Sequence, residues 1–178
     1  MRIRRLVPVL FLPLALATTA HAAPQPKSAA YTTFVVTSGA ASYEVLVLAV
    51  DGGQARVTVR VDDDLKYAGP AAVTVSATGA TLRTRLGSTP LTVTWSGVEQ
   101  KSVALTGDDS SVVTGLGYVL VGHGAVAKVQ LGEAACTIDV FSIVGTVVGD
   151  ELPSSAAPLS KASLEGSSCG EVAHSTVP

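Results

Sequence analysis

The sequence predicts an all-β fold: an antiparallel β-sandwich of about eight to ten strands, followed by a coil-like C-terminal tail. Between residues 31 and 150, β-branched residues are frequent, apolar and polar residues alternate, and glycine or aspartate clusters interrupt the runs. β-branched side chains suit a pleated surface, and a period of two gives a strand one buried and one wet face. A sandwich is favoured over a closed barrel because the runs are not regularly spaced, and no segment predicts a helix.

The first 22 residues have the pattern of a secretory signal peptide. Three arginines lie within the first five residues, an uncharged apolar stretch runs to Ala17, and Ala20-His21-Ala22 supplies a small-x-small cleavage site. The apolar stretch is shorter than the ~20 residues that a membrane span needs. We therefore expect a secreted chain that begins at Ala23 and has no membrane span after cleavage. The alternative is a short N-terminal anchor that stays uncleaved.

Cleavage would leave 178 − 22 = 156 residues, about the size of one domain. Residues 23–30 are expected to form a flexible lead-in and residues 31–150 the β-sandwich domain. Removing three arginines gives a net charge of (12 − 3) − 14 = −5, which argues against nucleic acid or an anionic membrane as partner. The chain has no asparagine and is rich in Ala, Val, Gly and Thr, a composition typical of a high-GC bacterial genome.

Turn residues divide the domain into hairpins. Gly52-Gly53 is expected to close the first hairpin, because consecutive glycines adopt the positive φ that tight turns need. Gly79-Ala80 is expected to close the second in the same way. The strands that alternation and these turns delimit most clearly are 43–51, 54–62, 71–78, 81–86 and 91–95.

Three segments are apolar on both faces: residues 45–50, 117–121 and 143–148. A strand of this kind is covered on both faces. One interpretation is that another segment of the chain, such as the tail, supplies the second cover. The other is a surface for self-association or for a partner protein. The candidate interaction face consists of Leu46, Leu48, Val50, Ile143 and Val147.

Cys136 and Cys169 are the only cysteines. Export places a chain in an oxidising compartment, where a lone cysteine pair usually forms a structural disulfide. That bond would clamp the tail, residues 151–178, which is rich in Ser, Ala and Pro. The alternatives are an intermolecular disulfide and free thiols.

Residues that could perform chemistry are few. His123 lies between two glycines, as expected for a histidine at a strand end or turn, and lacks the partners of a metal site. Residues 166–170 match the G-x-S-x-G nucleophile pattern, but no acid and histidine follow with room to form a triad. The acidic clusters 62–64 and 108–109 lack EF-hand spacing and suit turns. We therefore predict no catalytic, cofactor-binding or metal-ligating residue, and no cofactor.

The expected function is that of a secreted, non-enzymatic β-sandwich protein in extracellular or cell-surface structure or protein–protein interaction. Its partner would be an extracellular protein or a second copy of the chain. The alternative is a ligand-binding module for carbohydrate or a small apolar molecule, although Trp95 shares its strand face with apolar residues and is expected in the core. A third hypothesis is a hydrolase that uses scattered Asp, Glu and Ser.

Overall fold

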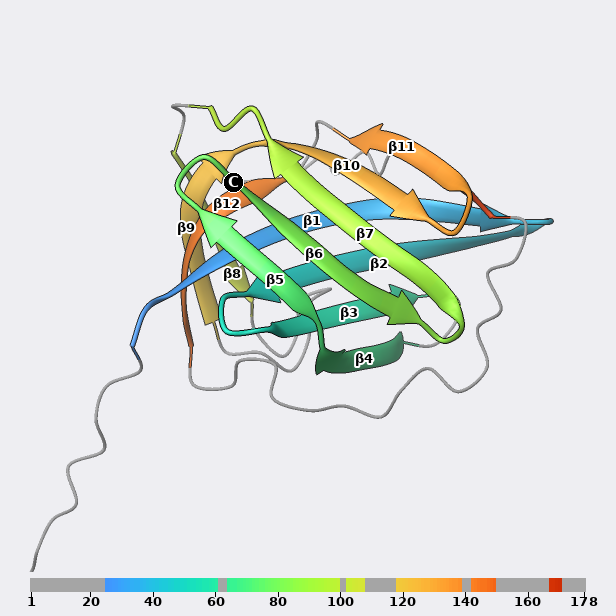
Figure 1. Ribbon diagram of the computed structural model, residues 1–178, viewed down its shortest axis with the longest axis horizontal. Coiled ribbons are helices and arrows are strands. Elements are labelled where there is room, and N and C mark those ends of the chain that lie inside the picture. The colour runs from blue at the N-terminus through green and yellow to red at the C-terminus, as the bar shows by residue number, and fades with distance from the viewer. Residues whose placement is uncertain are drawn as a thin grey trace, which may run out of the picture.

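The computed structural model describes residues 25–60, 64–99, 102–107, 118–138, 142–149 and 167–170. These residues form thirteen strands in two antiparallel sheets, and no helix occurs among them. The smaller sheet lies across the larger one (Figure 1). The predicted β-sandwich is therefore confirmed, with more strands than expected. The predicted signal peptide and the acidic cluster 108–109 lie outside the described residues.

The larger sheet contains the first strands and several late ones. Its strands are β1 (Lys27–Ser38), β2 (Ala41–Val50), β3 (Gln54–Arg60), β4 (Asp64–Pro70), β8 (Ser102–Gly107), β9 (Tyr118–Gly124), β12 (Ile143–Gly149) and β13 (Ser168–Gly170). Their order is β4-β3-β2-β1-β12-β9-β8, and β13 pairs with β1 beyond the end of β12. The C-terminal half of β1 thus has β2 on one side and a short strand from the tail on the other.

The smaller sheet is built from the middle of the chain. Its strands are β5 (Ala72–Ser76), β6 (Gly79–Leu86), β7 (Thr89–Ser96), β10 (Val126–Leu131) and β11 (Ala134–Ile138). Their order is β11-β10-β7-β6-β5, so β5 and β11 are its two edges. The chain enters this sheet directly after β4 and leaves it after β7, and it returns to complete the sheet with β10 and β11.

The hairpin expected at Gly52-Gly53 is confirmed, since these residues have φ of 95° and 81° between β2 and β3. The hairpin expected at Gly79 turns earlier, at residues 77–78, and Gly79 is the first residue of β6. A Cβ at Gly79 would lie 2.5 Å from a backbone carbonyl oxygen of β7. This glycine therefore permits a close strand approach and does not form the turn.

The strand alternation places one apolar face of each sheet in the space between them. Phe34 on β1 and Trp95 on β7 are among the largest side chains there, and both are fully or almost fully buried. The indole Nε1 of Trp95 donates a hydrogen bond of 2.9 Å to the backbone carbonyl of Tyr31. This bond joins the two sheets through the core. The expectation that Trp95 is a core residue is confirmed.

The first strand begins at Lys27, inside the segment expected to be a flexible lead-in. Ala29 and Ala30 are completely buried because β1 pairs with both β2 and β12 at this point. The strand β1 therefore starts four residues before residue 31, the expected first residue of the sandwich domain.

Candidate functional site

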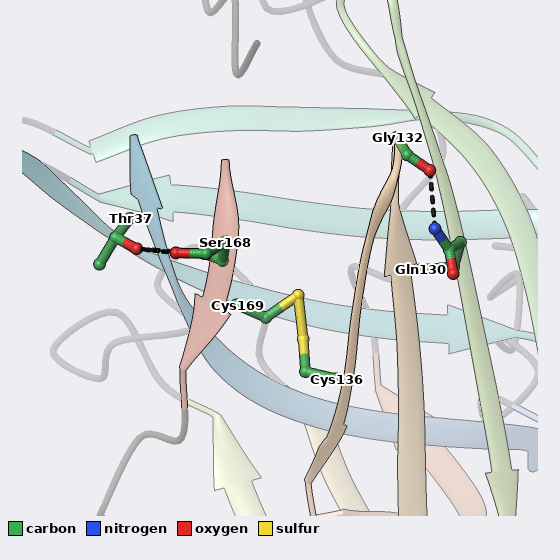
Figure 2. The surroundings of a disulfide bond; sticks show 6 residues. All are labelled: Thr37, Gln130, Gly132, Cys136, Ser168 and Cys169. Carbon is green, nitrogen blue, oxygen red and sulfur yellow. Dashed lines mark hydrogen bonds between the residues drawn. A yellow bond between two sulfur atoms is a disulfide. The ribbon is translucent and has the colours of Figure 1, made fainter. Parts of the chain in front are cut away.

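The two cysteines form a disulfide between the edges of the two sheets. Cys136 lies on β11 and Cys169 on β13, with Cα atoms 5.7 Å apart and an S–S distance of 1.99 Å. Cys169 is paired with Val36, a core residue, so its side chain points toward the smaller sheet. Figure 2 shows the bond crossing from the short tail strand to the edge strand β11. The expected pairing is confirmed.

Hydrogen bonds support the short strand that carries Cys169. The hydroxyl groups of Thr37 and Ser168 are hydrogen-bonded to each other, and the Thr37 hydroxyl also donates to the Ser168 carbonyl at 3.4 Å. On the other side of the disulfide, the side-chain amide of Gln130 donates to the Gly132 carbonyl at 2.7 Å, in the turn between β10 and β11 (Figure 2). Both ends of the disulfide are thus attached to hydrogen-bonded backbone.

An open pocket of about 830 Å³ lies beside the disulfide. It is formed by the turn between β6 and β7, the turn between β10 and β11, and the strand β13. Its lining is Ser88, Thr89, Pro90, Leu131, Gly132, Glu133, Ala134, Ala135, Ser167, Ser168 and Cys169. The lining combines hydroxyl groups with one carboxylate, that of Glu133, at an end of the sandwich. The volume lies within the range of small-molecule sites, ~300–1,000 Å³.

The candidate interaction face is buried. Leu46, Leu48, Val50, Ile143 and Val147 are each at most 2% exposed. The structure brings all five together in a second apolar cluster, on the face of the larger sheet that points away from the smaller sheet. Side chains with this burial offer no free contact surface in this arrangement. Their role in binding a partner stays a prediction.

The opposite face at the same strands is partly open. Val121 on β9 is 52% exposed and Val148 on β12 is 38% exposed, and these are the exposed large hydrophobic residues of the described part of the chain. The face that carries these two valines is covered in part, because Val144 on the same face of β12 is buried in the core between the sheets. Among the described side chains, two exposed valines do not supply the several hundred Å² of apolar surface that marks an interface.

His123 is the second-last residue of β9 and is half-buried. Its Nδ1 atom is buried and has no hydrogen-bond partner among the residues that the structure describes. The described residues contain no group of three or more His, Cys, Asp or Glu side chains able to hold a metal ion. The described part of the G-x-S-x-G match, residues 167–170, includes the sheet-paired strand β13, whereas the nucleophile motif requires a strand-to-helix turn.

The smaller sheet exposes a polar face that the sequence reasoning did not identify as a site. Threonine and serine are the most frequent residues at its outward positions, which also carry Arg83, Arg85 and Lys128. The alternation in each strand could have shown which residues point outward. Only the order of the strands shows that these positions form one continuous surface.

In the described ranges no helix is long and apolar enough to cross a membrane. No protein-family model matches the chain, and neither a curated protein nor a solved structure is significantly similar to it.

Proposed function

We propose that the mature chain is an exported, non-enzymatic β-sandwich protein that acts by binding at an extracellular or cell-surface site. The observation that carries this proposal is the disulfide between β11 and β13. Disulfides persist in oxidising compartments and are rare in the cytosol. The signal-peptide pattern in residues 1–22 supports the same compartment independently.

A binding role is supported by the distribution of polar groups. The described strands place most of their large apolar side chains in two buried clusters, and the smaller sheet presents a broad polar surface. A rigid sandwich of this kind holds surface groups at constant positions, which suits recognition of an extended partner. The proposed partner is an extracellular macromolecule or a second copy of the chain.

The proposal is tested by following the full chain in its source cells and by pull-down with the mature chain, residues 23–178. We expect the protein in the culture supernatant or the envelope fraction, with the disulfide intact, and the purified mature chain retained by envelope material. Protein found only inside the cell with reduced cysteines would refute the export part. Export without retention by envelope, supernatant proteins or itself would refute the binding part.

The pocket beside the disulfide favours a second candidate function, the binding of a small ligand. Its hydroxyl-rich lining and single carboxylate suit a polar molecule such as a short oligosaccharide. Replacing Ser88 by Trp would fill the pocket from the β6–β7 turn. Thr146→Trp, at an exposed position of β12 in the other sheet, is a matched surface control. A thermal-shift screen with oligosaccharides should give a stabilising ligand whose effect is lost only in Ser88→Trp. Stabilisation that persists in this variant would contradict the assignment to the pocket.

A further inference from the structure

The outward face of the smaller sheet forms aligned rows across five strands. One row runs through Thr74, Thr81, Thr94, Lys128 and Thr137, which are direct neighbours in the register of β5, β6, β7, β10 and β11. All five side chains are exposed or half-buried. Because the strands pair in register, hydroxyl groups recur at the strand spacing of ~4.8 Å along this row.

The next row carries more of the polar groups of this face. It runs through Ala72, Arg83, Thr92, Gln130 and Ala135 in the same strand order. Arg83, Gln130 and the two alanines are exposed. The two rows together give a surface of hydroxyl, amide and cationic groups on which side chains from five strands lie side by side. The five strands lie next to one another in Figure 1.

The charge of this face is opposite in sign to that of the protein. Its charged residues are Arg83, Arg85 and Lys128, and no outward position of the five strands carries a carboxylate. Glu99 and Glu133, the described acidic residues nearest to these strands in sequence, lie in the loop after β7 and in the turn between β10 and β11. The whole chain has a net charge of −2. A cationic surface on an acidic protein directs an anionic partner to that surface.

The cations are spaced for a long ligand. Arg83 on β6 and Lys128 on β10 are two strand spacings and one row apart, with β7 between them, which corresponds to ~12 Å from ideal sheet dimensions. Arg85 lies one row beyond Arg83, and its guanidinium donates to the Ser88 carbonyl, which holds it at the end of the sheet. Among the described residues, neither Arg83 nor Lys128 has an ion-pair partner. Hydroxyl groups occupy the positions between the cations.

We propose that this face binds an acidic polysaccharide, with Arg83 and Lys128 contacting carboxylate or phosphate groups and the threonines contacting sugar hydroxyls. The inference rests on the proposed extracellular function and names the class of partner. Single-stranded nucleic acid fits less well, because the outward positions of these five strands carry no aromatic ring on which bases could stack. An anionic membrane fits less well because the same positions carry no large apolar side chain other than the half-buried Val126.

The test uses the mature, disulfide-bonded chain on immobilised polygalacturonate, with dextran as the neutral polymer. We expect retention on polygalacturonate that weakens with added salt, and no retention on dextran. The double variant Arg83→Gln/Lys128→Gln should bind about tenfold more weakly, since each exposed charge contact contributes modestly. Lys27→Gln is the matched control, because Lys27 is an exposed cation on β1 in the other sheet. It should retain the affinity of the parent chain.

Several results would overturn the inference. An unchanged affinity in the double variant, or an equal loss in Lys27→Gln, would remove the binding site from this face. Equal retention on dextran would exclude charge recognition. If single-stranded DNA retained the protein as strongly as polygalacturonate does, the face would bind polyanions in general and would not be specific for an acidic polysaccharide. Urea unfolding of each variant ensures that the folded proteins are compared. If envelope retention persists without polygalacturonate binding, this inference fails while the proposed function stands.

Discussion

Replacing Cys136 and Cys169 by alanine removes the covalent connection between the two sheets. Their separation of 33 residues defines the loop that the bond closes. In the chain-entropy treatment, a loop of this length restricts the unfolded chain by an amount equivalent to ~3.7 kcal/mol at 25 °C. The folded state loses little direct contact, because both side chains are small and only partly buried. We therefore expect the free energy of unfolding to fall by ~3–4 kcal/mol.

Urea titration followed by tryptophan fluorescence measures this change. Trp95 is the only tryptophan and is 1% exposed, so its emission reports on the opening of the core between the sheets. With an m value of ~2 kcal/mol per M, the unfolding midpoint should fall by about 2 M. For a chain of this size the melting temperature should fall by about 7–15 °C. Dithiothreitol should bring the parent protein to the midpoint of the variant and leave the variant unchanged.

The same variant should open locally before it unfolds globally. Without the disulfide, β13 is held by three residue pairs with β1 and by the hydrogen bonds of Thr37 with Ser168. Such a short ladder at a strand edge has a low local opening free energy. Limited proteolysis of the folded variant should therefore cleave near residues 167–170 faster than in the parent protein. If replacing both cysteines by alanine lowers the free energy of unfolding by less than ~1 kcal/mol, the reasoning is refuted. Two alkylatable thiols in the native parent chain would refute it as well.

Three further predictions concern the two cores and the N-terminus. Leu48→Lys should lower the free energy of unfolding by ~4 kcal/mol or more, because it buries an unpaired charge at a position that is 1% exposed. Leu48→Met, which conserves volume, should stay folded. A folded, equally stable Lys variant that has lost only partner binding would show that the face is accessible. Trp95→Phe should lower the free energy of unfolding by ~3 kcal/mol, since it removes the hydrogen bond from the indole to the Tyr31 carbonyl and reduces core volume. Thermal unfolding followed by circular dichroism measures this change, and a loss below ~1 kcal/mol would contradict the role of the hydrogen bond. N-terminal sequencing of secreted protein should begin at Ala23, and a start at Met1 would refute signal-peptide cleavage.

Local patterns in the sequence determined the strands and several of their details. Alternation identified which residues of a strand share a face, and this assigned Trp95 to the core. The glycines at 52 and 53 determined one hairpin, because their positive φ is a property of the residue itself. The presence of only two cysteines, with a signal-peptide pattern, predicted their pairing. Each of these inferences depends on residues close together in the chain or on composition alone.

The tertiary structure alone decided which strands are neighbours. Strand β1 pairs with β12, which places Tyr31 opposite Ile143, and it also pairs with β13 from the tail. The sequence did not predict these pairings, because contacts between distant segments depend on the packing of the whole chain. The burial of the doubly apolar strand at Leu46 and Leu48 was likewise undetermined, because an apolar face looks the same in sequence whether it is covered or free. The prediction that Gly79 is a turn residue was wrong. The need for glycine at this position comes from the nearby Trp95 carbonyl on β7, and that contact could not be read from the residues around Gly79.

The cationic face of the smaller sheet has the same origin. Arg83 and Lys128 are separated by more than forty positions in the chain, and each alone is an ordinary exposed residue. They share a surface because β10 pairs with β7, although β8 and β9 lie between these two strands in the chain. Period-two alternation specifies the direction of a side chain but not the strand beside it, so the sequence determined the elements and the tertiary structure determined the surfaces.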